Sequence, residues 1–306
     1  MWKCYELEFK VKTPIHIGYG SKLGIINRTR YYIPGKTMWG AVTATLAREA
    51  MEGYEPKLYE DVGEFVREHM IFSYFYPLKD ESVLYPNYTD NGFGFGENNE
   101  YFISKEEFER DFVTSYISTA VDKSSKTAEE SSLHEFELIL PDNLLGYLFV
   151  DLDKNEDYDV SFAEIGEKKI TLRINNNPIK VFDSIESIQI GGERNYGFGQ
   201  LELQKKKIRE KNNPVNLYDS EVSVDLNNLT SETTNIALAH VDIKNLNFEN
   251  FRGDIEPIVG REWDKSSNKG AGQCISDPKI CLSPGSKFSS KYGVKIGCYG
   301  IWEADL

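Results

Sequence analysis

Four glycines within nine residues form the feature that most restricts how this chain can fold. The segment Gly191-Gly192-Glu193-Arg194-Asn195-Tyr196-Gly197-Phe198-Gly199 follows an apolar stretch and precedes Leu201 and Leu203. Glycine adopts positive φ without steric cost and lets one backbone approach another closely. The segment does not fit the GxGxxG turn that opens a helix in dinucleotide-binding folds, because an alternating run follows it. We therefore predict a tight loop that leads into a strand.

The same loop carries groups that suit a nucleic acid. Backbone N–H groups in glycine-rich loops can cradle phosphates. The guanidinium of Arg194 can fork onto a phosphate, and Tyr196 or Phe198 offers a ring face for a base. A glycine hairpin with no ligand would explain the same residues, so the loop alone leaves both interpretations open.

The flanking segments alternate between strands and helices. Apolar and charged residues alternate from Tyr5 to Val11, which predicts a half-buried strand. Helices are predicted over 36–51, where Thr37 is a plausible cap, and over 56–70, and a capping box of Ser104 and Glu107 predicts a third. Further strands are predicted around 136–140, 145–149, 170–174, 201–203 and 294–302. Without strict βαβ alternation, this order favours an α+β fold with antiparallel sheets.

A second basic and aromatic segment precedes the first predicted helix. A Pro34-Gly35 turn leads into Lys36 and Thr37, and the first turn of a helix offers free N–H groups to an anion. Upstream, Lys22, Arg28 and Arg30 lie close to Tyr31 and Tyr32, a mixture typical of proteins that bind single-stranded RNA. An ordinary capped helix would also account for the turn. A third, polar segment from Thr119 to Glu130 reads as a loop that leads into the strand at Phe136.

Charge and composition restrict the function classes. The net charge of −14 argues against a polyanionic ligand, because Lys and Arg drive phosphate binding. The charge is uneven, however: residues 1–50 hold eight basic and three acidic side chains, and residues 191–211 hold six and three. No apolar run reaches the length of a membrane span and no signal peptide is evident, so we expect a cytoplasmic protein. The four cysteines are widely spaced and indicate thiols; we expect neither a metal nor a cofactor.

The three segments together, in this order, resemble the RAMP superfamily, whose members are ferredoxin-like subunits of CRISPR complexes. The match rests on Ile33 to Gly40, Asp122 to Glu137 and Gly191 to Gly199, and it covers roughly residues 1–205. The resemblance implies two ferredoxin-like (RRM-like) domains with antiparallel sheets. We expect the first to span 1–212, with an insertion over about 54–130, and the second, degenerate one to span 213–306.

The cap subunits of type III complexes are the most similar members, and their glycine loop helps to hold the repeat-derived 5′ handle of the CRISPR RNA. The resemblance implies a non-catalytic subunit whose partners are CRISPR RNA and the large and backbone subunits. The residues expected to contact RNA are Lys22, Arg28, Arg30, Lys36, Thr37, Gly191, Gly192, Arg194, Tyr196, Gly197, Phe198 and Gly199. Alternatives are a filament-forming backbone subunit, a metal-independent RNA endonuclease that uses His16, and a subunit that binds only protein. Backbone subunits often cleave target RNA with an Asp after the first strand, and residues 18–33 contain no Asp or Glu.

Overall fold

The computed structural model describes residues 1–22, 24–53, 55–90, 92–97, 101–152, 160–246, 251–262, 272 and 274–304. Its first layer is an eight-stranded sheet with β1 (Trp2–Val11) near the centre, in the order β16-β17-β1-β12-β5-β6. β1 runs antiparallel to β12 (Asn143–Asp151) on one side and to β17 (Gln200–Leu203) on the other. The remaining strands are β4 (Met70–Phe72), β5 (Tyr76–Lys79), β6 (Ser82–Val83), β16 (Ser187–Gln189) and β18 (Arg209–Lys211).

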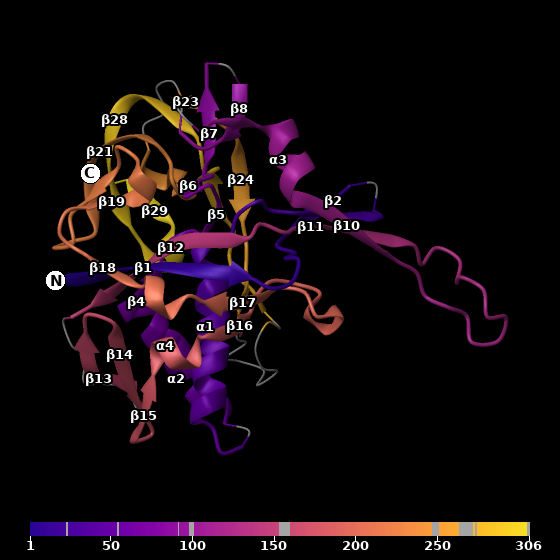
Figure 1. The fold of residues 1–306 in the computed structure, drawn as a ribbon, viewed down its shortest axis with the longest axis horizontal. Coiled ribbons are helices and arrows are strands. Elements are labelled where there is room, and N and C mark those ends of the chain that lie inside the picture. Colours follow the sequence, from indigo (N-terminus) through magenta and orange to yellow (C-terminus); the bar gives the residue numbers. More distant parts are fainter. Residues whose placement is uncertain are drawn as a thin grey trace.

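One face of this sheet is covered by the helices α1 (Gly35–Ala50) and α2 (Pro56–His69), which lie below the sheet in Figure 1. The alternation of the first strand explains this, because Tyr5, Leu7 and Phe9 are fully buried in the core shared with both helices. The helical periodicity of residues 36–51 likewise places Met38 and Val42 in that core. The predicted first strand and both of these helices are confirmed.

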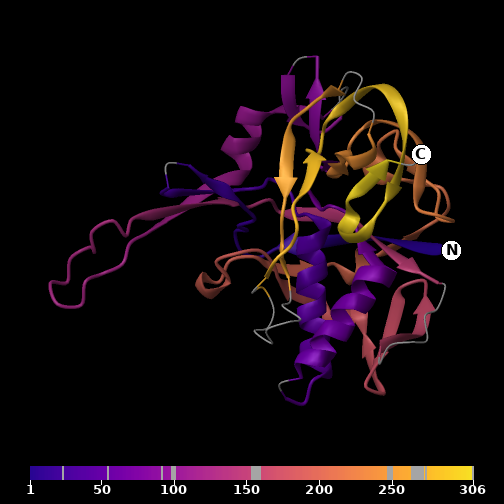
Figure 2. The ribbon, with the colours of Figure 1, turned by 180° about the vertical axis from the view of Figure 1, so that it is seen from behind.

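The opposite face is covered by the C-terminal third of the chain, so the first sheet is enclosed between two layers (Figure 2). That third forms a seven-stranded sheet in the order β21-β28-β29-β22-β27-β24, with β23 paired to β28. A second core, rich in tyrosine, joins Tyr76 and Tyr147 of the first sheet to Leu238 and Trp302. The strands are β21 (Thr230–Ile236), β22 (Val241–Asp242), β23 (Phe251–Arg252), β24 (Ile255–Ile258), β27 (Lys279–Leu282), β28 (Lys287–Ile296) and β29 (Trp302–Ala304).

A four-stranded sheet in the order β10-β11-β3-β2 projects from one side of the molecule. Its strands are β2 (Gly18–Lys22), β3 (Ile26–Thr29), β10 (Val113–Ser118) and β11 (His134–Ile139). The β10–β11 hairpin is the long arm that extends away from the body in Figure 1. The predicted polar segment 119–130 is the tip of this arm.

Smaller elements complete the fold. Three strands, β7 (Pro86–Thr89), β8 (Gly92–Phe95) and β9 (Ile103–Ser104), precede α3 (Lys105–Phe112). Another three-stranded sheet consists of β13 (Val160–Gly166), β14 (Lys169–Ile174) and β15 (Asn177–Lys180), followed by the short helix α4 (Val181–Ser184). Two pairs remain, β19 (Val215–Asn216) with β20 (Ser223–Val224), and β25 (Arg261–Glu262) with β26 (Cys274–Ile275).

Helix and strand ends test the finer predictions. The N-cap of the predicted capping box is confirmed, since the backbone N–H of Glu107 donates to Ser104 Oγ at 3.2 Å. The cap predicted at Thr37 is wrong, because Pro34 occupies the N-cap position of α1 and the Thr37 N–H donates to the Pro34 carbonyl. The predicted final strand is interrupted, because Cys298 lies in a one-turn 3-10 helix between β28 and β29.

The second half departs from the predicted fold. An α+β fold with mostly antiparallel sheets is confirmed for the chain. A ferredoxin-like unit also needs two α-helices. Among the described residues beyond 213, the helical segments are all single turns of 3-10 helix. The reason is local: Pro278 and Pro284-Gly285 lie in connections between short strands there, whereas Pro257, also expected in a turn, lies within β24.

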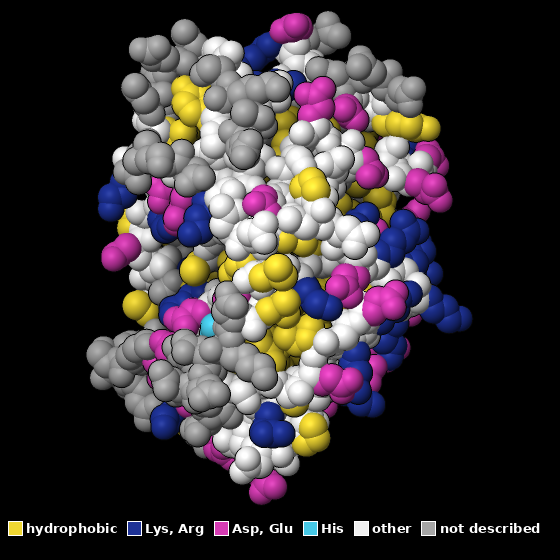
Figure 3. Space-filling model, turned by 90° about the vertical axis from the view of Figure 1, so that its left-hand side faces the viewer, with side chains coloured by type: hydrophobic (Ala, Val, Ile, Leu, Met, Phe, Trp, Pro, Cys, Tyr) yellow, Lys and Arg dark blue, Asp and Glu magenta, His cyan; other side chains and the backbone are white. Residues whose placement is uncertain are grey.

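Surface charge is mixed rather than uniformly acidic. Figure 3 shows Lys and Arg side chains gathered along one edge of a face, with Asp and Glu among them and a band of hydrophobic side chains beside them. All four cysteines are free thiols, and Cys4 and Cys281 are buried. None of the helices formed by the described residues has the length and apolar character needed to cross a membrane.

Candidate nucleic-acid interface

The glycine loop is fastened to the segment that follows β1. The N–H of Gly192 donates to the His16 carbonyl at 2.9 Å, and the N–H of Gly199 donates to the Pro14 carbonyl at 2.8 Å. Gly191 has a φ of +74°, and a Cβ there would lie 2.3 Å from the His16 carbonyl oxygen. The close backbone approach that four glycines predicted is therefore made to the protein's own chain.

These bonds change what the loop can offer a phosphate. The N–H groups of Gly192, Tyr196, Gly197 and Gly199 all donate to backbone carbonyls. The side chain of Gln189 also holds the loop, because its amide donates to the carbonyls of Arg194 and Phe198 at 3.0 and 2.9 Å. The loop is thus a rigid platform, and its outward side chains are the groups best placed to meet a ligand.

Those side chains form an exposed aromatic cluster with one cation. Tyr196 is half exposed, and its ring centroid lies 5.6 Å from that of Tyr116 on the β10 strand of the arm. Phe198 packs against Tyr116 at 5.4 Å in an edge-to-face arrangement. Arg194 is exposed on the same loop, and no carboxylate within the described parts of the chain pairs with it. We call Tyr116, Tyr196 and Phe198 the loop platform.

Tyr116 is a functional candidate that sequence reasoning missed. It lies in a short segment, Val113 to Ser118, whose partner strand begins sixteen residues beyond its end. The segment does not alternate between buried and exposed positions, because four consecutive residues are exposed: Thr114, Ser115, Tyr116 and Ile117. Only the pairing of β10 with β11 brings it to the loop.

His16 occupies the space between the loop and the arm. Its Nδ1 lies 2.9 Å from the Glu137 carbonyl, and its ring packs edge-to-face on Phe136. The side chain is only 6 % exposed, and a Cβ on Gly192 would lie 3.2 Å from its Cδ2 atom. This environment favours a role in holding the loop.

The predicted anion site at the start of α1 is covered by β4 and by the 3-10 turn at Cys298–Gly300. A Cβ on Gly35 would lie 2.2 Å from the Phe72 carbonyl oxygen and 2.4 Å from that of Tyr299. Lys36 Nζ sits 4.8 Å above the ring of Tyr299. Lys36 and Thr37 therefore lie at an internal contact of the protein, where carbonyl oxygens surround the helix start.

The basic residues upstream of the helix divide into two groups. Arg28 and Arg30 both stack on Tyr19, at 5.3 and 4.6 Å from its ring centre. Arg30 is largely buried and forms two hydrogen bonds with Glu256, whereas no carboxylate in the described residues pairs with Arg28. Of the two, only Arg28 has a guanidinium available to a phosphate. The side chain of Lys22 lies outside the described residues.

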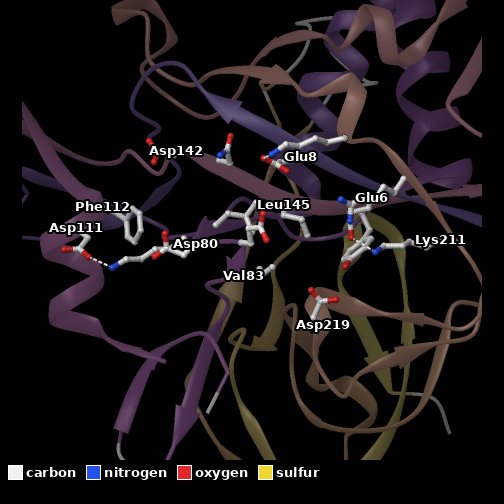
Figure 4. Close-up of a pocket in the computed structure, with 17 residues that line it drawn as sticks. Glu6, Glu8, Asp80, Val83, Asp111, Phe112, Asp142, Leu145, Lys211 and Asp219 are labelled. Atoms are coloured by element: carbon white, nitrogen blue, oxygen red, sulfur yellow. Dashed lines mark hydrogen bonds and ion pairs between the residues drawn. The ribbon is translucent and has the colours of Figure 1, made fainter. Parts of the chain in front are cut away.

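A separate cleft of about 640 Å³ opens on the face of the first sheet, and Figure 4 shows its lining. Glu6 and Glu8 project into it from β1, and each forms an ion pair. The Glu6–Lys211 and Glu8–Lys207 nitrogen–oxygen distances are both 2.6 Å. The lining contains seven carboxylates and four cations: Glu6, Glu8, Asp80, Glu81, Asp111, Asp142 and Asp219 against Lys79, Lys207, Arg209 and Lys211. The excess of acid disfavours a polyanion as the ligand of this cleft.

No metal-binding site is evident in the part of the chain that the structure covers. Within it, no group of three or more His, Cys, Asp or Glu side chains is placed to hold a metal ion.

Comparisons with known proteins identify the family and support the fold. The model of the RAMP superfamily matches residues 8–202. The chain also resembles the cryo-EM structure of the Type III-B Cmr-beta bound to cognate target RNA and AMPPnP, state 1, with a TM-score of 0.52 and 15 % identity over 94 % of this chain and 86 % of that one. A second structure, Type III-B Cmr-beta bound to cognate target RNA, gives a TM-score of 0.52 at 14 % identity over the same shares. No curated protein sequence matches the chain.

Proposed function

Because this chain belongs to the RAMP superfamily, we propose that it is a non-catalytic subunit of a type III CRISPR effector complex that grips CRISPR RNA. The observation that carries the proposal is the loop platform, where Tyr196 and Phe198 meet Tyr116. The same loop carries Arg194, which pairs with no carboxylate among the described residues. Exposed rings next to a cation suit single-stranded RNA, whose bases stack on aromatic faces while the backbone meets Arg or Lys. The repeat-derived 5′ handle is the segment we assign to this surface.

The first 212 residues form, in this proposal, one ferredoxin-like unit. The strand order β17-β1-β12-β5 with antiparallel neighbours supports it, as does the position of α1 between β1 and β5 and of α4 between β12 and β17. The insertion expected over 54–130 would then fall into two parts, α2 and the stretch that holds the β7–β9 strands and half of the arm, because β4 and β5 within that range belong to the core sheet. The boundary at 213 is supported by β18, which ends at Lys211 and still pairs with β1, whereas β19 joins a different sheet.

A non-catalytic role fits the surroundings of His16. In the endonuclease alternative, His16 would be the catalytic base. A general base must reach the proton that it abstracts. His16 Nδ1 is occupied by the Glu137 carbonyl and the ring is enclosed by Phe136 and Gly192. The large and backbone subunits of the same complex are the protein partners we assign, and a filament-forming backbone position is the second candidate within the family.

The test is to incubate the purified chain with a labelled repeat RNA and to measure both retention and cleavage. We expect retention without cleavage, and a loss of retention in Tyr196→Ala and Arg194→Gln. Tyr101→Ala is the matched control, because Tyr101 is equally exposed but lies outside the loop platform. Cleavage that disappears in His16→Ala would establish the endonuclease instead. RNA affinity that Tyr196→Ala and Arg194→Gln leave unchanged would favour a subunit that contacts only protein.

A further inference from the structure

A hollow of about 500 Å³ lies where the β2–β3 strands, the β7–β8 hairpin and the C-terminal sheet meet. Six aromatic rings line it, and we call it the aromatic cleft: Tyr19, Tyr31, Tyr32, Tyr88, Phe93 and Phe95. We infer that the aromatic cleft binds one unstacked nucleotide of a single-stranded RNA, with its base against the rings and its phosphate at Arg28. The inference rests on the proposed function, since it assumes that the chain binds RNA.

The rings of the cleft are held in place from behind. Phe93 lies 4.7 Å from Tyr88 and 5.4 Å from Phe95, measured between ring centroids. Phe95 in turn stacks at 4.0 Å on Phe108, which is completely buried. A base that enters therefore meets a preformed wall, and little ordering of side chains opposes its binding.

Three cations line the cleft, and Lys105 lies 3.7 Å from the Glu109 carboxylate, so the remaining two decide where a phosphate can bind. Arg30 is held by Glu256, and the carboxylate of Asp254 accepts a hydrogen bond from the Tyr88 hydroxyl at 2.7 Å. Arg28 stacks on Tyr19, and its guanidinium pairs with no carboxylate in the described residues. An arginine on an aromatic face with its donors unpaired matches the way single-stranded nucleic acid is held.

The aromatic cleft and the loop platform are linked through the start of β2. The Gly192 backbone contacts His16, and a Cβ on Gly18 would lie 3.9 Å from His16 Nε2. Tyr19, the next residue, enters the cleft. In Figures 1 and 2 the β2–β3 strands lie between the glycine loop and the β7–β8 hairpin along the vertical direction. One RNA strand can therefore pass from the platform to the cleft, which favours RNA over a peptide as the occupant.

Crosslinking separates this inference from the proposed function. A ten-nucleotide RNA containing 4-thiouridine is irradiated with the full-length chain, and the crosslinked residues are mapped by mass spectrometry. We expect crosslinks at Tyr88 or Phe93 as well as at Tyr196 or Phe198. Crosslinks confined to Tyr196 and Phe198 would overturn the cleft and leave the proposed function standing. Crosslinks confined to Tyr88 and Phe93 would support the cleft and remove the loop platform, and an absence of crosslinks would overturn both.

Affinity measurements supply the second test. Phe93→Leu keeps an apolar side chain but removes the ring, and we expect it to weaken binding of the same RNA roughly 5- to 150-fold. Arg28→Gln should lower the slope of log affinity against log salt by about one. The controls are Tyr101→Ala and Arg209→Gln, both exposed and outside the cleft. Unchanged affinity in Phe93→Leu and Arg28→Gln, with melting temperatures equal to that of the wild type, would overturn the inference.

Discussion

Arg30 and Glu256 stand 226 residues apart in the sequence and form a two-pronged ion pair, with both nitrogen–oxygen distances at 3.0 Å. Arg30 follows β3 and Glu256 lies in β24, so the pair ties the N-terminal part of the chain to the C-terminal sheet. Glu256 also bonds to His240 at 2.6 Å, and the Tyr74 hydroxyl lies 2.5 Å from His240 Nδ1. Burial alone would raise the pKa of Glu256, but the hydrogen bonds from His240 and Arg30 outweigh it and lower the pKa to about 2.

Removing one charge of this pair should destabilise the fold strongly. In Glu256→Gln, Arg30 stays buried without its counter-ion, and such a change costs about 3–5 kcal/mol of unfolding free energy. Urea denaturation followed by circular dichroism measures it. Glu202→Gln is the matched control, because Glu202 pairs with Lys12 at 3.0 Å in an exposed position, where the loss is about 1 kcal/mol or less. Equal losses in the two variants would contradict the structural role of the Arg30–Glu256 pair.

The same network predicts that stability falls in acid. Burial lowers the pKa of His240 below its usual value near 6.5, so the unfolded chain binds a proton there that the native chain does not. The unfolding free energy should therefore decrease as the pH falls below about 6.5. It should decrease further as the pH falls from 4.5 towards 2, because the native Glu256 resists protonation.

Urea midpoints measured between pH 7 and 5 isolate the histidine. The variant His240→Gln should lose stability at pH 7 and show a shallower dependence on pH over that range. A pH dependence in His240→Gln as steep as that of the wild type would assign the acid sensitivity to other groups.

Two glycines of the same loop separate backbone conformation from steric clash. Gly197 and Gly199 have φ values of +85° and +80°, but a Cβ on Gly197 meets nothing within 4 Å, whereas one on Gly199 would lie 2.0 Å from the Ile190 carbonyl oxygen. Gly197→Ala should cost about 1–2 kcal/mol, the strain of a left-handed alanine. Gly199→Ala adds a clash with backbone and should cost clearly more, as shifts in thermal midpoint will show. If the two alanine variants are equally stable, the loop relaxes at Gly199.

Local features of the fold were predictable from the sequence, whereas its long-range contacts were not. Alternation from Tyr5 to Val11 and the N-cap at Ser104 depend on neighbours in the chain, and the structure confirms both. The glycine loop was also predicted, but its N–H groups were expected to face a ligand and instead bind Pro14 and His16. The partner of Arg30 lies 226 residues away, and no periodicity or motif indicates such a pairing.

The candidate site shows the same division. Arg194, Tyr196 and Phe198 were predicted from one segment, and they lie on one loop. Arg194 and Tyr196 are exposed there, and Phe198 is partly buried. Lys36, predicted from the helix start that contains it, instead contacts Tyr299 in the 3-10 turn between β28 and β29, because tertiary packing covers that start. Tyr116 joins the loop platform only once β10 has paired with β11. Tyr19 lies in the local β2–β3 hairpin, and it enters the aromatic cleft because β7, β8 and the C-terminal sheet pack beside that hairpin.

The loop platform should show two separable contributions to RNA binding. Tyr116→Ala and Tyr196→Ala each remove a ring on which a base can stack, so each should cost about 1–3 kcal/mol of binding free energy with little change in salt dependence. Arg194→Gln removes one phosphate contact and should lower the slope of log affinity against log salt by about one. Fluorescence anisotropy with a labelled handle RNA at several salt concentrations measures both quantities.

Tyr196→Phe is the internal control, because it keeps the ring and should bind nearly as well as the wild type. A loss in Tyr196→Phe as large as in Tyr196→Ala would mean that the hydroxyl makes the contact, and base stacking on the loop would then be wrong.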